Sequence, residues 1–410
     1  MGIDAFVDAT FKVGNFEAVL PGGRRLRAGD GSGPPVVVRI TDRMTLVRLV
    51  TQTSLGAGEA YMDGRLIMEQ GSIHDLVALT AMNLARRPPN RAGSLRRLLA
   101  KGMRERNQRL SARRNVAHHY DLPVELYRTF LDEDLQYSCA YFHRPDMTLE
   151  QAQLAKKRHI IAKLDLGEAA GGQEARVLDI GCGWGGLALS LAAWTGARVH
   201  GVTLSTEQLD TARARAEAAG LSNRVEFSLT DYRDAEGPYD RIVSVGMFEH
   251  VGRPNYQAFF DKIADLLADD GVALIHSIGR GEGPTTTDLF TAKYIFPGGY
   301  IPALSEVLPA VERAGLWVAD IEILRLHYAE TIRIWRERFA AHRPQLVETY
   351  DERFCRMWEF YLSGAEVSFR YGRHMNFQLQ LTKRRDALPL TRDYIGENER
   401  LLSKARERAA

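Results

Sequence analysis

The residues best suited to chemistry in this chain surround a glycine-rich turn. An apolar strand predicted at 176–180 contains an acid, Asp179, and leads into Gly181 and Gly183 before a helix begins. Glycine lets the backbone approach a ligand closely, and the N-terminus of the following helix offers N–H donors without intrahelical partners. The pattern therefore predicts a cofactor site at the carboxyl end of this strand.

Three features favour S-adenosylmethionine over a dinucleotide at this turn. Asp179 stands where a carboxylate would repel a pyrophosphate but can hold the ammonium group of S-adenosylmethionine, directly or through water. The third glycine of the dinucleotide fingerprint is not at its usual distance from Gly181 and Gly183. Asp231 and Tyr232 follow a later strand, at the place where an adenine edge is usually read.

The ribose of such a cofactor lacks its usual carboxylate partner in this sequence. The next predicted strand, 198–202, is followed by Thr203 and Leu204 and has no acid at its end. Gln208, on the first turn of the following helix, is the expected substitute. The simpler alternative, that the whole turn serves only strand–helix packing, stays open at this point.

Strands alternate with helices on both sides of the turn. Strands are predicted at 176–180, 198–202, 225–229, 241–245 and 271–277, and helices at 148–164, after Gly186, at 208–219 and at 256–267. This alternation implies a parallel, doubly wound α/β sheet. The helix at 148–164 opens on a capping box and is expected to be amphipathic. Further helices are predicted at 303–314 and 328–367, with a strand at 316–324.

Residues 1–85 have the pattern of a small α+β domain. A β-branched run at 36–40 follows a turn signal, and 45–53 has helical spacing. Nucleophiles and metal ligands do not cluster in this stretch, so it is predicted to be a packing or binding domain without chemistry. The catalytic domain is expected at 115–395.

The segment 86–114 between them is strongly basic. It holds eleven Lys or Arg and one acid, Glu105, so its net charge is +10, while the whole chain is +2 and the remainder therefore −8. A basic amphipathic stretch in a near-neutral protein favours contact with an anionic surface, either phospholipid headgroups or nucleic acid. A plain solvated linker is the alternative.

The overall composition excludes several classes of protein. The chain has 410 residues, 45% hydrophobic and 26% charged, which is typical of a soluble globular protein of two domains. Three cysteines give no disulfide framework, and His118, His119 and His250 lack metal-ligand spacing with any of them, so no metal is expected. The N-terminus lacks the pattern of a signal peptide, which favours the cytoplasm.

Several motifs in one order resemble a known family. The chain from about 115 to 382 resembles the cyclopropane-fatty-acid synthases and the related mycolic acid cyclopropane synthases. The motifs that carry the resemblance are His119-Tyr120-Asp121, 137–142, 177–185, 201–205, 247–252, 294–299, His327-Tyr328 with Thr331 and Trp335, and Cys355 with Trp358, Tyr361 and Leu362. The resemblance implies a Rossmann-like class I methyltransferase fold. Residues 58–64 resemble part of the small N-terminal domain of the longer bacterial enzymes, which favours the phospholipid-acting branch.

The resemblance also implies which residues bind the ligands. The family's cofactor contacts fall on Tyr137, Ser138, Gly181, Gly183, Thr203, Leu204, Gln208, Asp231 and Tyr232. Its bicarbonate ligands fall on the side chains of Cys139, Glu249, His276 and Tyr328 and on the backbone of Ile278. Cys355 matches a family cysteine near the site that is not a nucleophile. For four of these residues the sequence leaves a simpler alternative: Glu249 as a helix cap, and His276, Cys139 and Cys355 as core residues.

The implied reaction is methyl transfer to a cis alkene of a phospholipid acyl chain, with bicarbonate as the base. Attack leaves a carbocation, which aromatic faces can stabilise, and loss of a proton from the transferred methyl then closes a cyclopropane ring. The candidate aromatic residues, which are as easily core residues, are Tyr294, Phe296, Tyr300, Trp358 and Tyr361. The resemblance further implies an unsaturated phospholipid partner, peripheral contact with the inner face of the membrane, a homodimer and no nucleic acid.

Three alternatives to this reaction stay open. The same cation can lose a different proton and give a methylene- or methyl-branched chain. Some small-molecule N-methyltransferases share the fold and the Glu249–His250 pair. A lipid- or nucleic-acid-binding protein with a vestigial cofactor turn is the third alternative.

Overall fold

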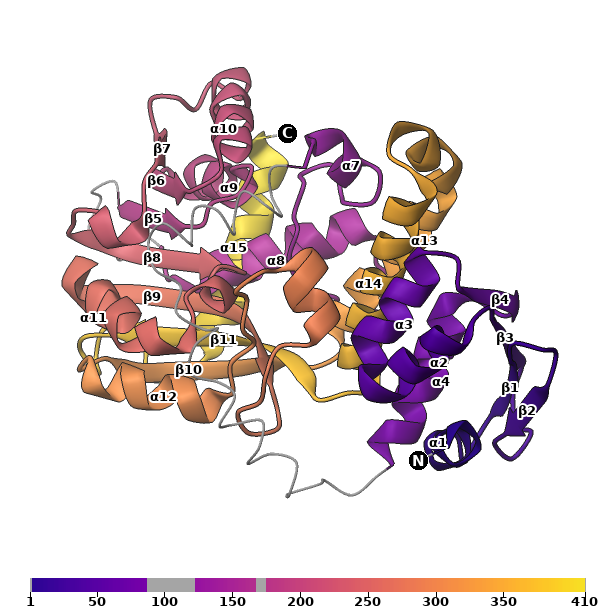
Figure 1. The fold of residues 1–410 in the computed structure, drawn as a ribbon. Coiled ribbons are helices and arrows are strands. Elements are labelled where there is room, and N and C mark those ends of the chain that lie inside the picture. Colours follow the sequence, from indigo (N-terminus) through magenta and orange to yellow (C-terminus); the bar gives the residue numbers. More distant parts are fainter. Residues whose placement is uncertain (1, 87–121, 167–174, 410) are drawn as a thin grey trace. The chain divides into compact units, whose positions relative to one another are not determined.

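The structure is a computed structural model that describes residues 2–86, 122–166 and 175–409 (Figure 1). Except for Arg86, the predicted basic segment 86–114 lies outside the described residues, as do His118 and the motif His119-Tyr120-Asp121. By its internal contacts the chain divides into two compact units. The described part of the first comprises 2–86, Thr285–Pro297 and Ala329–Arg373, and the second holds the remaining described residues.

The second unit is built on a seven-stranded sheet in the order β10-β11-β9-β8-β5-β6-β7. Its strands are β5 (Arg176–Ile180), β6 (Arg198–Thr203), β7 (Val225–Leu229), β8 (Tyr239–Val245), β9 (Leu267–Arg280), β10 (Trp317–Leu324) and β11 (His374–Thr382). The five strands from β7 to β9 pair in parallel, and β11 runs antiparallel to both β9 and β10. The predicted doubly wound sheet is therefore confirmed. The strand order reverses beside β5, and ligands of such sheets bind at that point.

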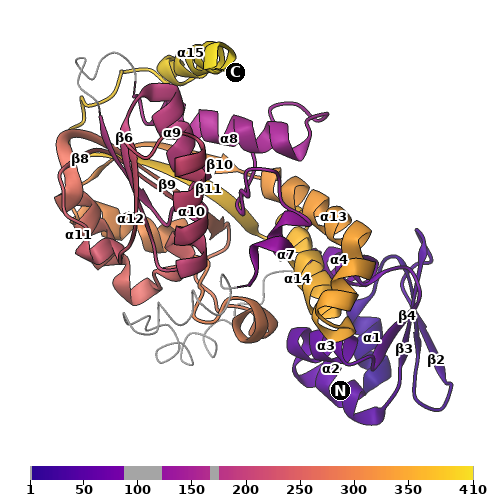
Figure 2. The same ribbon diagram turned by 90° about the horizontal axis from the view of Figure 1, so that it is seen from above.

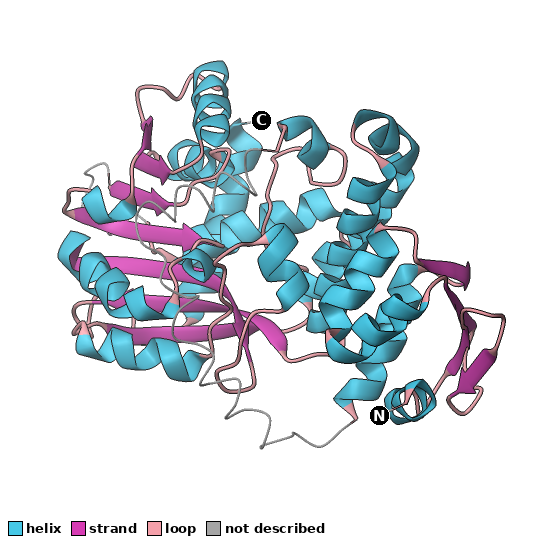
Figure 3. Ribbon diagram, viewed as in Figure 1, coloured by secondary structure: helices cyan, strands magenta, loops and turns pink. Residues whose placement is uncertain are grey.

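Helices cover both faces of this sheet (Figures 2 and 3). They are α8 (Leu149–Lys163), α9 (Gly186–Thr195), α10 (Thr206–Ala218), α11 (Tyr256–Leu266), α12 (Leu304–Arg313) and α15 (Asp393–Ala409), with a short α7 (Val124–Arg128) before them. Residues of α8, α9 and α10 share one core cluster, and residues of α11 and α12 share another. The helix predicted at 148–164 is thus α8, but most of its surface is buried, including Lys156 and Lys163, so its expected amphipathic character is wrong.

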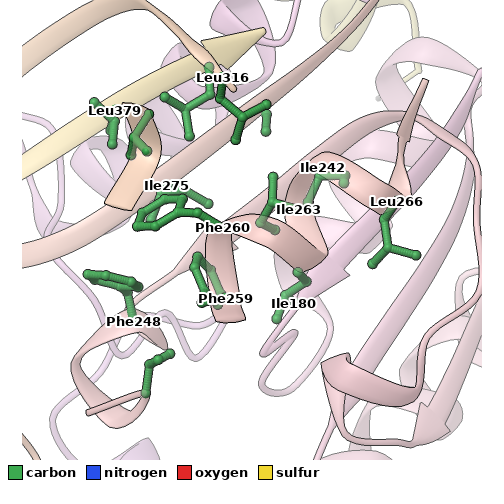
Figure 4. Close-up of a cluster of buried hydrophobic side chains, with 14 of the residues drawn as sticks. Ile180, Ile242, Phe248, Phe259, Phe260, Ile263, Leu266, Ile275, Leu316 and Leu379 are labelled. Carbon is green, nitrogen blue, oxygen red and sulfur yellow. The ribbon is translucent and has the colours of Figure 1, made fainter. Parts of the chain in front are cut away.

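Side chains of the central strands alternate between these two cores. Ile275 of β9 and Leu379 of β11 point into the cluster that packs under α11 and α12 (Figure 4). Their neighbours His276 and Gln378 therefore face the other side, toward α8, because successive side chains of a strand point to opposite faces. The alternation places His276 and Gln378 on the face opposite the apolar cluster of Ile275 and Leu379.

The sequence did not predict β11. Its residues alternate polar and apolar side chains, and its polar face is buried rather than exposed to solvent. The helix predicted at 328–367 is two helices, α13 (His327–Thr349) and α14 (Glu352–Arg370). Asp351 divides them because its side chain accepts a hydrogen bond from the backbone N–H of Phe354, 2.6 Å away, and so caps α14.

The first unit contains a four-stranded sheet in the order β2-β1-β3-β4. Its elements are α1 (Ile3–Thr10), β1 (Asn15–Val19), β2 (Arg25–Ala28), β3 (Pro35–Ile40), α2 (Arg43–Thr51), α3 (Thr53–Met62), β4 (Leu66–Gln70) and α4 (Ile73–Ala85). The predicted α+β character of the N-terminal residues is confirmed. However, α14 packs against α3 and α4, so the division at 85 and 115 that the sequence suggested does not describe this grouping.

The motif at 58–64 lies on α3 and at its end, where it contacts the two later segments of the same unit. Gly58 faces Phe290 and Phe360, and a Cβ added to it would lie 2.3 Å from Cδ2 of Phe290. Glu59 accepts a hydrogen bond from the hydroxyl of Tyr294 over 3.0 Å. The hydroxyl of Tyr61 donates to Glu359 of α14 over 2.8 Å. The motif therefore packs the N-terminal residues against the later helices of the unit.

We predict that Gly58→Ala lowers the stability of the protein by about 1–3 kcal/mol, because the added methyl overlaps the rings of Phe290 and Phe360. The matched control is Gly364→Ala in α14, where nothing lies within 4 Å of an added Cβ. That change should be neutral or stabilise by roughly 0.5–1 kcal/mol through helix propensity. Urea unfolding followed by circular dichroism compares the two variants, and equal midpoints would contradict the packing role of Gly58.

Candidate active site

A pocket opens at the carboxyl ends of β5 and β6, at the reversal point of the sheet. All ten predicted cofactor residues line it, including both glycines of the turn. Lining residues that the sequence analysis did not assign to the cofactor are Leu135, Gln136, Ile180, Cys182, Trp184, Leu187, Val202, Thr230, Arg233, Val245, Gly246, Met247, His250 and Val251. The structure thus brings the predicted set together in one place.

The two glycines of the turn share an unusual backbone conformation but differ in the space around them. Gly181 has φ +79°, and a Cβ there would lie 2.9 Å from the side chain of Met247. Gly183 has φ +55°, and no atom lies within 4 Å of the place of its absent Cβ. Both need the left-handed conformation that glycine adopts without strain, and Gly183 also leaves room for a ligand.

Asp179 is the buried carboxyl of the pocket. It is 2% exposed, and burial raises its pKa to about 7, although the ammonium of nearby Lys156 acts in the opposite direction. A buried carboxylate without a bonded cation is costly, so the group is easily protonated in the free protein. An arriving ligand ammonium would favour the ionised form.

The predicted ribose contact is organised by Thr203. Its hydroxyl donates to Oε1 of Gln208 over 3.0 Å and accepts from the backbone N–H of Ser205 over 3.2 Å. The hydroxyl of Ser205 in turn caps α10. Because the amide oxygen of Gln208 is engaged, its amide nitrogen is the group that can donate to a ligand hydroxyl.

Asp231 already has a protein partner in this pocket. Its carboxylate accepts a hydrogen bond from Nε of Arg233 over 2.8 Å and from the backbone N–H of that residue over 3.1 Å. The ring of Tyr232 packs edge-on against Phe259 of α11. Arg233 was not predicted from the sequence. Its position two residues after Asp231 was the only indication that it could contact this carboxylate.

Two polar residues of α8 hold the loop at 135–138 against the pocket. The amide nitrogen of Gln153 donates to the carbonyl oxygens of Gln136 and Ser138 over 3.0 and 2.9 Å. The ammonium of Lys156, one helical turn later, donates to the side chains of the same two residues over 2.5 and 2.9 Å. Leu135 at the start of the loop has φ +58°, a strained conformation for leucine that these bonds help to fix. The role of Lys156 could not be predicted from the sequence, because a lysine in a helix is usually exposed.

A second group of predicted residues lies on β9 and the turn at 248–250. Glu249 is 7% exposed, and Oε1 of its carboxylate accepts a hydrogen bond from the backbone N–H of Ile278 over 2.6 Å. Oε2 is buried and has no hydrogen-bond partner among the described residues. Burial raises the pKa of Glu249 to about 7. The carboxylate reaches across to β9, so the helix-cap alternative for Glu249 is wrong.

His276 lies two residues before Ile278 on the same face of β9. Its Nδ1 lies 3.2 Å from the amide nitrogen of Gln378, and its Nε2 lies 3.4 Å from that of Asn376. Burial lowers its pKa to about 3, and the cationic side chain of Lys156 acts in the same direction. The ring is therefore neutral, with one donor and one acceptor nitrogen.

The other predicted bicarbonate and catalytic residues are placed as follows. Cys139 is fully buried, its Sγ donates to the carbonyl of Ala140 over 3.4 Å, and burial raises the pKa of its thiol. Tyr328 is 8% exposed and follows His327, whose Nδ1 accepts from the backbone N–H of Phe142 over 3.0 Å. Cys355 is buried on α14 in the first unit, whereas the other four lie in the second.

The candidate aromatic residues are divided between the two compact units. Tyr300 lies in the second unit, within the hydrophobic core, and its hydroxyl donates to Glu306 over 2.7 Å. Phe296, Trp358 and Tyr361 lie in the first unit, where Tyr361 packs edge-on against the other two. Tyr300 is thus a core residue with a capping partner, and Phe296, Trp358 and Tyr361 form one aromatic group.

The family model described as mycolic acid cyclopropane synthetase matches residues 107–379. The chain belongs to this family. It is 38% identical to the cyclopropane-fatty-acyl-phospholipid synthase of Escherichia coli over 84% of this chain and 87% of that protein. It is 37% identical to the tuberculostearic acid methyltransferase UfaA1 of Mycobacterium tuberculosis, over 84% and 82% of the two chains. A crystal structure of mycolic acid cyclopropane synthase CmaA1 complexed with SAH and CTAB aligns with a TM-score of 0.61 at 33% identity, covering 66% of this chain and 97% of that one.

Membership of this family makes the protein an S-adenosylmethionine-dependent methyltransferase of lipid acyl chains, with the class I fold expected from the sequence. The pocket fits that cofactor, because it combines the open turn at Gly183, the buried carboxyl of Asp179 and the amide group of Gln208, whose oxygen is held by Thr203. Across 2–86, 122–166 and 175–409, His, Cys, Asp and Glu side chains do not gather into a group of three that could hold a metal. Over the same residues, each helix is too short or too polar to cross a bilayer.

We predict that binding of S-adenosylhomocysteine strengthens as the pH rises from 6 to 8, because its ammonium requires Asp179 to be ionised and the pKa of that carboxyl is raised to about 7. Below that pKa the dissociation constant should rise toward about tenfold per pH unit, since each binding event must then release a proton. Calorimetry in buffers of different ionisation enthalpy measures the released proton. Asp179→Asn should bind more weakly and without this proton release; an unchanged pH profile in that variant would contradict the assignment.

Proposed function

We propose that the protein transfers the methyl group of S-adenosylmethionine to the cis double bond of an unsaturated phospholipid acyl chain and closes a cyclopropane ring, with bound bicarbonate as the base. The observation that carries the proposal is the buried Oε2 of Glu249, which lacks a hydrogen-bond partner among the described residues, while Oε1 of the same carboxyl accepts from the N–H of Ile278. A buried polar atom in that state favours a ligand that completes its hydrogen bonds.

The donor set supports an anion as that ligand. Burial raises the pKa of the Cys139 thiol, so this group keeps a proton that it can donate. Burial raises the pKa of Glu249 to about 7, so its carboxyl can give a proton to an anion or take one from it near neutral pH. His276 is neutral and Tyr328 carries a hydroxyl, and each can donate one hydrogen bond as well. A bicarbonate held by these residues would supply a base for the proton of the transferred methyl. In the structure the N–H of Ile278 donates to Glu249, so it would have to be shared with such an anion.

The methyl transfer itself requires alignment of the alkene with the methyl group and does not require a protein base. An alkene has no proton to remove before it attacks the methyl group, so alignment and exclusion of water matter most. The resulting cation is stabilised by aromatic faces. Phe296, Trp358 and Tyr361 are the proposed residues, with Tyr294 and Cys355 in the same unit.

The extent of the matches supports the phospholipid substrate. Cyclopropane mycolic acid synthase 3 of Mycobacterium tuberculosis aligns with 63% of this chain, whereas the phospholipid synthase of Escherichia coli aligns with 84%. The motif at 58–64, which resembles part of the N-terminal domain of the longer bacterial enzymes, supports the same substrate. We further propose that the protein works in the cytoplasm, at the inner face of the membrane, through the basic segment 86–114, and as a homodimer.

A second candidate product is a methyl-branched chain. The similarity to the tuberculostearic acid methyltransferase covers the same 84% of this chain at 37% identity. The two reactions share the methyl transfer and the cation. Loss of a proton from the transferred methyl closes the ring, whereas loss of a proton from a neighbouring chain carbon leaves a methyl-branched alkene.

Incubation with S-adenosylmethionine and vesicles of monounsaturated phosphatidylglycerol separates these products. We expect mass spectrometry to show one added CH₂ per chain and proton NMR to show the strongly upfield signal of a ring. Vinylic or methyl-branch signals with added mass would favour the second candidate. No added mass together with tight cofactor binding would reject both in favour of a small-molecule N-methyltransferase.

We predict that Glu249→Gln lowers turnover by at least about 100-fold while S-adenosylhomocysteine still binds, because an amide cannot exchange a proton with the anion as a carboxyl of raised pKa can. The matched control is Glu306→Gln, which removes another mostly buried carboxyl that bonds to Tyr300 in the core. It should keep activity within a few-fold. Full activity of Glu249→Gln would remove the bicarbonate site from the proposal.

We predict that neutralising Arg96, Arg97, Lys101 and Arg104 together weakens binding to anionic vesicles by roughly tenfold or more at low salt. Each basic residue near an anionic surface contributes about 1 kcal/mol, and salt screens this contribution. The control neutralises four basic residues outside the segment, Arg24, Arg27, Arg384 and Arg385, and should bind nearly as well. Vesicle sedimentation measures both, and equal loss in the two variants would show a general charge effect instead.

A further inference from the structure

Two buried residues lie directly behind His276. Gln378 of β11 is the cross-strand partner of His276, and its amide nitrogen lies 3.2 Å from Nδ1 of the imidazole. The other end of the amide, Oε1, accepts a hydrogen bond from the ammonium of Lys163 over 2.8 Å. Lys163 is fully buried on α8 and Gln378 is 1% exposed, so water does not replace either partner.

The chemistry of Lys163 decides which way the amide of Gln378 faces. An ammonium group has three donors and no acceptor, so only the oxygen of the amide can face it. A carboxylate oxygen of Glu322 accepts from the same ammonium, and Asp320 lies 3.8 Å away. With its oxygen held by Lys163, Gln378 must direct its N–H toward His276. Nδ1 of His276 is then an acceptor.

The surroundings of His276 keep its ring neutral, with its one proton on the other nitrogen. Burial lowers the pKa of His276 most, and the cations Lys156, Lys163 and His159 lower it further, while Glu322 raises it. These charges come from α8 and β10, the elements that supply the charged groups near the ring. A neutral imidazole whose Nδ1 accepts carries its proton on Nε2.

Asn376 provides an independent observation at Nε2. Its amide nitrogen lies 3.4 Å from Nε2, while its own Oδ1 is buried and lacks a partner among the described residues. Two donors would oppose each other in this arrangement if Nε2 is protonated. Turning the amide by 180° places Oδ1 opposite the proton on Nε2 and removes the unsatisfied oxygen. That proton then has the amide of Asn376, or an oxygen of a bound anion, as its acceptor.

We propose that Lys163, acting through Gln378, fixes the proton of His276 on Nε2 and so makes His276 a hydrogen-bond donor to the anion of the active site. The inference rests on the proposed function, which places an anion beside His276. Lys163 and Gln378 are positioning residues, since they act on the anion only through the imidazole. His276 accordingly serves as a donor and not as the base.

The tautomer can be measured without any turnover. In full-length protein labelled with ¹⁵N-histidine, long-range ¹H–¹⁵N NMR distinguishes a protonated ring nitrogen from an unprotonated one, and His276→Gln assigns the signal. We expect wild-type His276 to be neutral with its proton on Nε2. In Gln378→Glu the new carboxylate can only accept, so the proton of His276 should move to Nδ1. A wild-type proton on Nδ1 would overturn the inference whether or not the variant folds.

Activity measurements with matched variants test the consequence. Gln378→Glu should lower kcat about 10- to 100-fold, the range for partners that orient a ligand-binding histidine, with the affinity for S-adenosylhomocysteine unchanged. Gln380→Glu adds the same charge two residues further along the buried face of β11, where its amide bonds to the carbonyl of Lys163 and to Tyr394. It should leave the His276 tautomer unchanged. Lys163→Arg, which keeps a donor toward Gln378, should preserve both the tautomer and most of the activity.

The outcomes separate this inference from the proposed function. A tautomer that moves in Gln378→Glu together with a loss of kcat supports the inference. A tautomer that moves while kcat stays at the wild-type value, or a kcat that falls equally in Gln380→Glu with the tautomer unchanged there, overturns the donor role of His276. If the wild-type protein forms no cyclopropane ring, the proposed function fails, and the spectrum of the wild-type protein still decides the orientation of His276.

Discussion

The site depends on one constraint, which is that the ammonium group of Lys156 is buried. This group is fully buried, and its hydrogen bonds to Gln136 and Ser138 hold the loop that forms one wall of the cofactor pocket. Its charge also acts on Asp179 in the pocket and on His276 in the second group of residues. An unpaired buried charge is costly, so the bonds that satisfy Lys156 also fix the geometry around it. The pocket and the proposed anion site thus share one cation.

Burial raises the pKa of two carboxyl groups in the second compact unit, but the two groups would serve different ligands. The pKa values of Asp179 and Glu249 are both raised to about 7 by burial. Asp179 faces the pocket, where a ligand ammonium would favour its ionised form. Glu249 lies among groups that donate hydrogen bonds, where an anion would favour its protonated form. The environment, and not the side-chain type, gives each carboxyl its role.

The N-terminal residues group with two later segments of the chain in one compact unit. The motif at 58–64 packs against 285–297 and α14 through Gly58, Glu59 and Tyr61. Those later segments carry Cys355 and four of the candidate aromatic residues for the cation: Tyr294, Phe296, Trp358 and Tyr361. A change in the N-terminal motif is therefore expected to reach the aromatic group through packing alone.

Local patterns in the sequence determined the cofactor turn, the doubly wound sheet and the α+β character of the first residues, because each depends on residue spacing within one or two elements. Asp179, Gly181 and Gly183 are adjacent in the chain, and the pocket around them follows from the strand that precedes them. The role of β11 could not be read in this way, since its alternating pattern is also typical of an exposed strand. Only the tertiary structure places Gln378 opposite His276, Lys163 behind Gln378, and the carboxylate of Glu249 on the N–H of Ile278. These contacts join residues from about 30 to more than 200 positions apart, and burial then decides which of them carry a proton.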